Sequence, residues 1–182
     1  EELPFRNVVS WTTLIAGYGR IGEHTTVFGL FKQMTREGIE PNLVTFTVLL
    51  NACCFAGLID EGQTYFETMS TSYGIVPTLQ HHTCMVAGFG RGGQFDKAVS
   101  VIKVMPSSAH SSAVWVALLG ACRKWGNVKL ASVAFDQALQ VDPYCAAAYV
   151  LMANIFSAAG MHKDANKLQT MMLKDSAWKK EV

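Results

Sequence analysis

The sequence is poor in charge and in proline, and it lacks long hydrophobic runs. Only 16% of its 182 residues are charged and the net charge is +1, so the basic surplus typical of general nucleic-acid binders is missing. No apolar run approaches the roughly 18 residues that span a bilayer, which argues against a membrane-spanning helix. Half of the residues are hydrophobic, which excludes a disordered chain and leaves enough apolar surface for a core.

Metal-binding and catalytic signatures are also missing. The sequence has five cysteines but no C-x-x-C pair and no H-x-E element, which excludes a zinc knuckle and a zinc deaminase centre. An odd number of cysteines without a secretory signal predicts buried, inert thiols in a reducing compartment. The cysteines are Cys53, Cys54, Cys84, Cys122 and Cys145.

The strongest candidate for a metal site is the pair His81 and His82, which lies beside Cys84. The repeat described below assigns these residues to ordinary positions at the start of a helix, so we predict neither a metal nor a cofactor. No nucleophile, base and metal set converges elsewhere, and the sequence therefore predicts a protein that is not an enzyme.

The sequence does contain a repeat of about 35 residues. Five segments align without gaps, and their starts lie 35, 36, 33 and 34 residues apart. These starts are Trp11, Phe46, His82, Trp115 and Tyr149. A glycine follows each start by eleven residues, at Gly22, Gly57, Gly93, Gly126 and Gly160. Because glycine tolerates positive φ and ends helices, each repeat should turn from one helix into the next at this point.

Two apolar stripes flank each glycine. In the first repeat, Leu14 and Ile15 precede the glycine and Phe28 and Phe31 follow it, with the spacing of two amphipathic helices. One hairpin cannot bury both stripes, so neighbours must stack around a shared core. Prolines at Pro41, Pro77, Pro106 and Pro143 break the second helices where one repeat hands over to the next. The sequence thus predicts an all-α, right-handed α-solenoid of about five helix-turn-helix repeats with a concave inner face.

The residues within this period resemble a known family. NVVSWTTLIAGYGR, the ACCFAGLIDEG core with its YGI-P tail, and HTCMVAGFGRGGQFDKA are similar to repeats of plant pentatricopeptide repeat (PPR) proteins of the PLS class, whose repeats vary in length. The resemblance implies a standard repeat over 8–42, a long repeat over 43–78 and a short repeat over 79–111, after the tail of a preceding repeat over 1–7. Segments 112–145 and 146–182 resemble the two tetratricopeptide-like E motifs of such proteins.

This resemblance implies a function in RNA processing. Proteins of this class are sequence-specific single-stranded RNA-binding factors for C-to-U editing of organelle transcripts. Their E motifs recruit or position a cytidine deaminase-domain protein and other editing factors. We therefore expect a mitochondrial or chloroplast protein, while the residues do not specify the organelle, the transcript, the edited site or the oligomeric state. They also leave open whether a deaminase domain follows in a longer chain or acts in trans.

The same resemblance assigns roles to individual residues, on the scheme of about one base per repeat. Pairs of polar side chains read each base: Thr12 with Asn42, Thr47 with Thr78, and Thr83 with His110. Threonine with asparagine resembles the adenine-preferring combination, whereas Thr78 and His110 match no clear combination. Val9 and Val44 would sandwich bases, with Gln80 departing from that pattern, and Arg20 and Arg91 would contact phosphates.

An alternative interpretation stays open at this point. The three threonines also fit ordinary residues near a helix N-terminus, and a period near 35 is shared with scaffolds that bind only proteins. If RNA is bound, three stacked bases would contribute roughly 3–9 kcal/mol before ordering and association costs. We therefore expect micromolar or weaker binding by this chain alone.

Overall fold

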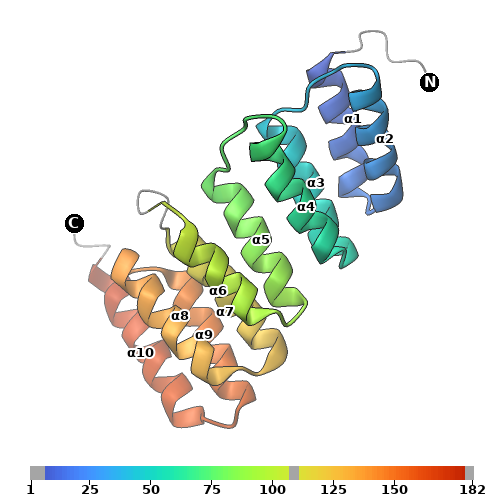
Figure 1. Ribbon diagram of the computed structural model, residues 1–182. Helices are drawn as coiled ribbons and strands as arrows, with labels where there is room; N and C mark the ends of the chain where they lie inside the picture. The colour runs from blue at the N-terminus through green and yellow to red at the C-terminus, as the bar shows by residue number, and fades with distance from the viewer. Residues whose placement is uncertain (1–6, 107–110, 179–182) are drawn as a thin grey trace. The chain divides into compact units, whose positions relative to one another are not determined.

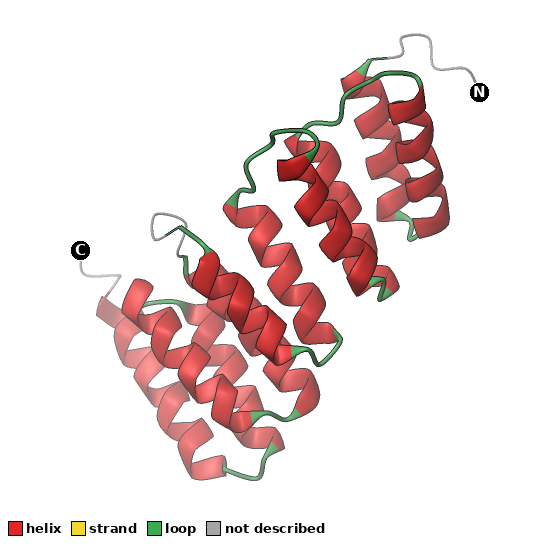
Figure 2. Cartoon of the chain, viewed as in Figure 1, coloured by secondary structure: helices red, strands yellow, loops and turns green. Residues whose placement is uncertain are grey.

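The computed structural model describes residues 7–106 and 111–178, with side chains up to residue 172, and its regular structure there is entirely helical (Figure 2). Within these residues ten helices follow one another, joined by turns and loops (Figure 1). They are α1 Val8–Arg20, α2 His24–Arg36, α3 Leu43–Ala56, α4 Ile59–Thr71, α5 Leu79–Arg91, α6 Phe95–Val104, α7 Ser112–Trp125, α8 Val128–Val141, α9 Ala146–Ala158 and α10 His162–Trp178. The all-α helical-repeat solenoid predicted from the period is confirmed, and the right-handed sense of its winding stays a prediction.

The chain divides into two compact units, which we call unit 1 (Glu1–Gly92) and unit 2 (Gly93–Val182). The boundary passes between the two helices of the predicted short repeat, so that α5 belongs to unit 1 and α6 to unit 2. In unit 1 the helices α1, α3 and α5 follow one another side by side, with α2 and α4 packed against them. In unit 2, α7 packs against α8 and α9, and α9 against α10.

The core of unit 1 is built from the stripes that the repeat predicted. Phe46 lies at its centre, where its ring meets Phe31 and Tyr73 edge to face at 6.1 and 5.5 Å. The fully buried Ile15 and Leu49 come from the matching stripe of α1 and α3. Fully burying one such side chain stabilises a fold by roughly 1.5–3 kcal/mol, so each hairpin depends on its neighbour for stability.

The turns confirm the predicted role of the periodic glycines. All five have positive φ, with values of 81° at Gly22, 74° at Gly57, 73° at Gly93, 65° at Gly126 and 76° at Gly160. The prolines lie between or after helices, as expected. In the part of the chain that the structure describes, no helix is both long and apolar enough to cross a membrane.

Candidate functional site

The sequence-predicted residues of unit 1 gather at the starts of α1, α3 and α5. Each of these helices begins with a capping box, in which the residue before the helix and the third helical residue bond to each other. The capping pairs are Asn7 with Ser10, Asn42 with Thr45, and Thr78 with His81. Because α1 packs on α3 and α3 on α5, the cap of α3 lies near Thr12 on α1, and the cap of α5 lies near Thr47 on α3.

Thr45 joins the first predicted reading pair, Thr12 and Asn42. The hydroxyl oxygens of Thr12 and Thr45 lie 2.7 Å apart, and the Thr45 hydroxyl donates to Asn42 Oδ1 at 3.1 Å. The backbone N–H of Asn42 donates to Thr45 Oγ1 in turn, at 3.2 Å. Thr45 is fully buried and Thr12 is 6% exposed, so this is an interior network that opens to solvent chiefly at Asn42.

Hydrogen positions in this network follow from its fixed donors and acceptors. The Thr45 backbone N–H donates to Asn42 Oδ1 at 3.0 Å, which turns the carbonyl oxygen of Asn42 inward and its amino group outward. The Thr45 hydroxyl lies 2.7 Å from Thr12 Oγ1 and 3.1 Å from Asn42 Oδ1, so its single hydrogen can serve either contact. The network therefore leaves the amino group of Asn42 as its outward donor.

His81 joins the second predicted pair, Thr47 and Thr78. Its imidazole Nε2 lies 3.1 Å from Thr47 Oγ1, and its Nδ1 lies 2.8 Å from Thr78 Oγ1. The Thr78 backbone N–H also donates to Nδ1 at 3.1 Å, and the carbonyl oxygen of Leu43 lies 3.0 Å from Nε2. His81 is 1% exposed, so it bridges the two hydroxyls from inside the unit.

These contacts allow one tautomer of His81. A backbone N–H can only donate and a carbonyl can only accept, so Nδ1 is the bare nitrogen and Nε2 carries the hydrogen. Burial lowers the pKa of His81, which keeps the ring neutral at physiological pH. The Thr78 hydroxyl must therefore donate to Nδ1, while Thr47 donates to the Leu43 carbonyl at 3.0 Å. Both hydroxyls are left with acceptor lone pairs only.

Exposed side chains flank these networks at the predicted base-sandwiching positions. Val9 is 66% and Val44 57% exposed, among the most exposed large hydrophobic side chains described. Gln80 occupies the matching place on α5 and is exposed as well. Apolar side chains that stand in solvent next to polar groups are suited to stacking on a planar ligand.

The third predicted pair is described only in part. The hydroxyl of Thr83 donates to the carbonyl of Leu79 at 2.8 Å, as Thr47 does to Leu43. His110, its predicted partner, lies outside the described residues.

The two predicted phosphate-binding arginines are exposed at the far ends of their helices. Arg20 is the last residue of α1 and Arg91 the last of α5. The Arg91 guanidinium lies over the ring of Phe55, 4.5 Å from its centroid, a cation–π arrangement. In the aligned repeats, Phe55 on α3 occupies the same position as Arg20 on α1 and Arg91 on α5.

Unit 2 has apolar residues where unit 1 has these networks. Aligned on Trp115 and Tyr149, the place of Thr12 and Thr47 is taken by Val116 and Val150. The place of the bridging Thr45 and His81 is taken by the buried Val114 and Ala148. The hairpins of unit 2 therefore offer no polar pair of this kind.

An apolar groove lies on α9 and α10 of unit 2. It has a volume of about 290 Å³ and is lined chiefly by Tyr149, Val150, Ala153, Leu168 and Met172. Val150 is 48% exposed, so the groove opens at a place that corresponds to a reading position in unit 1.

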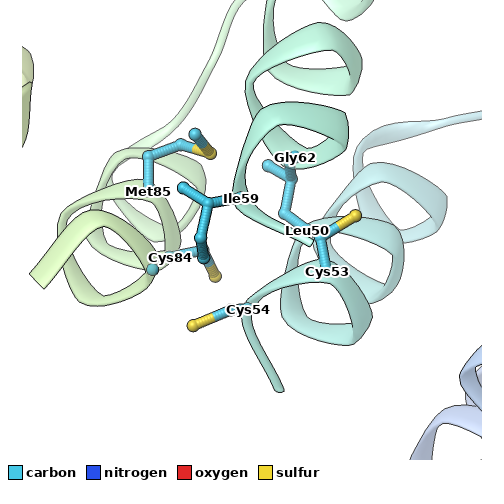
Figure 3. A pocket seen from close by; sticks show the side chains of 8 residues that line it. Leu50, Cys53, Cys54, Ile59, Gly62, Cys84 and Met85 are labelled. Atoms are coloured by element: carbon cyan, nitrogen blue, oxygen red, sulfur yellow. The ribbon is translucent and has the colours of Figure 1, made fainter. Parts of the chain in front are cut away.

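The cysteines form no metal site in the described part of the chain, where no cluster of three potential ligands occurs. Cys53, Cys54 and Cys84 line a small pocket of about 10 Å³ together with apolar side chains and Gly62 (Figure 3). Burial raises the pKa of Cys53 to about 12 and those of Cys84 and Cys122 to about 11. The prediction of buried thiols is confirmed for Cys53, Cys54 and Cys122, whereas Cys84 and Cys145 are half-buried.

Sequence reasoning missed the two bridging residues. Thr45 was not singled out, and His81 was assigned to an ordinary helix start. The sequence did contain a signal for these bridging residues. The residue before each aligned start is polar in the first three repeats (Ser10, Thr45 and His81) and apolar in the last two (Val114 and Ala148).

Three family models match the chain. The PPR repeat family matches residues 6–54, and the PPR repeat matches residues 44–72 and 81–109. The E motif matches residues 125–181. Together the two repeat models cover more than half of the chain, and the E motif covers most of the remainder.

Curated relatives come from Arabidopsis thaliana. Two pentatricopeptide repeat-containing proteins are each 41% identical, over 93% and 94% of this chain. A third, named mitochondrial, is 42% identical over 94%, and another, named chloroplastic, is 34% identical over the whole chain. The chain covers between 20% and 34% of the length of these four proteins.

Solved structures support the fold. The crystal structure of the maize pentatricopeptide repeat protein PPR10 matches 93% of this chain with a TM-score of 0.74 and 23% identity, over 25% of its own length. The same protein in complex with an 18-nucleotide psaJ RNA element matches 92% with a TM-score of 0.61 and 22% identity, over 28% of its length.

Proposed function

The chain belongs to the pentatricopeptide repeat family and carries an E motif, and on this premise we propose that unit 1 reads single-stranded RNA. Thr12 with Asn42 and Thr47 with Thr78 meet successive bases, and Thr83 begins a third reading position. Val9 and Val44, with Gln80 on α5, flank the bases, while Arg20 and Arg91 supply positive charge near phosphates.

One observation carries this proposal: hydrogen bonds through Thr45 join the two predicted reading side chains, Thr12 and Asn42, and they engage Asn42 Oδ1, which leaves the Asn42 amino group as the donor that a base can meet. The ring nitrogens N1 of adenine and N3 of cytosine are acceptors that can receive a hydrogen bond from this amino group. Guanine and uracil carry a hydrogen on the corresponding ring nitrogen, so an amino donor directed at that nitrogen would disfavour them. The adenine preference implied by the threonine–asparagine combination agrees with this chemistry.

We further propose that the protein is a specificity factor for C-to-U editing in a mitochondrion or chloroplast, and that it is not itself the catalyst. The organelle names of some relatives support this localisation. Unit 2 would recruit or position a cytidine deaminase-domain protein and other editing factors. The apolar residues at its reading positions and the groove on α9 and α10 support a role in binding protein rather than bases.

The reading proposal is tested by Asn42→Asp, which replaces an outward amino donor with an acceptor. Short single-stranded RNAs, varied at each nucleotide in turn, are titrated against the whole chain by fluorescence anisotropy. We expect the preference at one nucleotide to move from adenine to guanine, by about tenfold in relative affinity. A wild-type chain without base preference at any nucleotide, or an unchanged preference in the variant, would contradict the proposal.

The partner proposal is tested separately with Val150→Asp, which places a charge in the groove at an exposed position. Co-purification of the whole chain with a deaminase-domain protein should be lost in this variant. RNA binding should be kept, since unit 1 is unchanged. Failure of the wild-type chain to retain such a partner would leave only the RNA-reading half of the proposal.

A further inference from the structure

We infer that His81 makes the long repeat a guanine reader, by holding the hydroxyls of Thr47 and Thr78 as a pair of acceptors. The inference rests on the proposed reading of RNA by unit 1 and goes beyond it. Threonine at both reading positions matched no clear combination, so the sequence left the base of this repeat open.

The chemistry of the imidazole carries the inference. Nδ1 accepts from the Thr78 backbone N–H at 3.1 Å, so the contact between Nδ1 and the Thr78 hydroxyl at 2.8 Å is a hydrogen bond that the hydroxyl donates to the ring. His82 restrains the same residue from the other side, because its Nδ1 lies 2.9 Å from the carbonyl oxygen of Thr78. The side chain of Thr78 therefore presents its oxygen, not its hydrogen, to a ligand.

The hydroxyl of Thr47 is oriented by the opposite edge of the same ring. Nε2–H is directed at Thr47 Oγ1 and at the Leu43 carbonyl, at 3.1 and 3.0 Å. The hydrogen of Thr47 is bonded to that carbonyl. Thr47 and Thr78 thus lie at opposite edges of one imidazole, and each hydroxyl oxygen can still accept a hydrogen bond from a ligand.

Guanine fits this pair best. Its Watson–Crick edge places N1–H next to the N2 amino group, and no other base of RNA has two adjacent donor groups on that edge. Adenine and cytosine would bring a ring nitrogen against an acceptor, and uracil would bring a carbonyl. An acceptor that faces another acceptor forms no hydrogen bond, and such a mismatch makes a polar site selective.

The standard repeat supplies an internal contrast. Its bridge is the hydroxyl of Thr45, which donates to Asn42 Oδ1 instead of accepting. The two reading side chains are therefore connected by a threonine in the standard repeat and by a histidine in the long repeat. This difference changes whether a base meets a hydrogen-bond donor or an acceptor. His81 is a positioning residue in this scheme, because it acts on the base through Thr47 and Thr78.

Two substitutions at His81 separate positioning from packing. In His81→Thr, the new hydroxyl can donate to Thr78 Oγ1, as Thr45 does to Asn42, which frees the hydrogen of Thr78 as a donor. In His81→Asn, the side-chain oxygen can take the place of Nδ1 and keep accepting from Thr78. Both variants lose the imidazole ring, so they share any loss of packing, which thermal unfolding measures.

The experiment uses the whole chain and a panel of short single-stranded RNAs whose central nucleotides run through all combinations of the four bases. Wild-type protein should prefer guanine over adenine by about tenfold at one nucleotide. His81→Asn should keep most of that preference, and His81→Thr should abolish it or reverse it toward adenine. Thr45→Val, the cross-control, should weaken selectivity at the neighbouring nucleotide and leave the guanine preference in place.

The outcomes are distinguishable from a failure of the proposed function. If Asn42→Asp shifts one base preference but His81→Thr leaves every preference unchanged, RNA reading stands and the role of His81 is refuted. An equal loss of affinity for all bases in both His81 variants also refutes it, since that is the signature of packing alone. Absence of any base preference in the wild-type chain overturns both proposals.

Discussion

Units 1 and 2 repeat the same helical hairpin but begin their first helices differently. In unit 1, α1, α3 and α5 each start with a capping box. The boxes of α3 and α5 also contact a threonine on the first helix of the preceding repeat. In the described part of unit 2, the Ser111 side chain accepts from the Ala113 backbone N–H at the start of α7, and the residue before α9, Cys145, makes no side-chain cap. Hairpins of this type therefore stack without polar bridges.

This difference teaches that the bridges of unit 1 are not a requirement of the fold. Val114 and Ala148 fill the same places with apolar side chains that are 1% and 0% exposed. A buried hydrogen-bond network contributes little net stability over a well-packed apolar substitute. The proposed reading of RNA would give the polar residues of unit 1 a role beyond the stability of the fold.

The largest expected loss of stability comes from truncating the buried apolar stripes, which both units share. Phe46→Ala in unit 1 and Leu118→Ala in unit 2 remove fully buried side chains from equivalent stripes. We expect losses of about 3–5 and 2–5 kcal/mol in the free energy of unfolding, measured by urea denaturation followed by circular dichroism. A loss below about 1 kcal/mol for either variant would mean that the apolar stripe is not the common basis of the two units.

Exchanging the bridging residues sharpens the comparison. Val114→Thr places a hydroxyl at a buried position of α7, where the wild-type side chain is apolar and 1% exposed. We expect a cost of about 1–3 kcal/mol, measured by the same denaturation. A neutral result would indicate that unit 2 can accommodate a bridge, and the contrast between the units would then be one of sequence only.

A smaller cost is expected for the reverse exchange, Thr45→Val in unit 1. The nearly isosteric valine keeps the packing but removes the bonds to Asn42 and Thr12, including the reciprocal cap of α3. We expect a loss of about 1 kcal/mol. Destabilisation well above that of Val114→Thr would make the bridge a structural requirement and would weaken its interpretation as part of a binding site.

How much of this could be predicted from the sequence depends on the range of each interaction. The glycine turns and helix pairs follow from local periodicity, so Gly57 and Gly126 marked the ends of α3 and α7 correctly. The bridges could not be placed in the same way, because Thr12 and Thr45 are 33 residues apart and His81 and Thr47 are 34 apart. Such bonds depend on how neighbouring hairpins pack, which the period implies but does not specify.

The smallest expected effect is a pH dependence that only unit 1 carries through His81. Burial lowers the pKa of His81 in the folded chain below the value of about 6.5 that it has when unfolded. Below about pH 6.5 the unfolded chain therefore binds a proton that the folded chain resists, so stability falls with decreasing pH. Protonation would also turn Nδ1 into a donor facing the Thr78 backbone N–H.

Urea denaturation between about pH 5 and 7.5 measures this dependence, with His81→Asn as the non-titrating control. We expect the wild-type free energy of unfolding to decrease more steeply toward acid than that of the variant. Identical slopes would mean that His81 accepts a proton without breaking its bonds, and the bare Nδ1 on which guanine selectivity depends would then not be enforced by the fold.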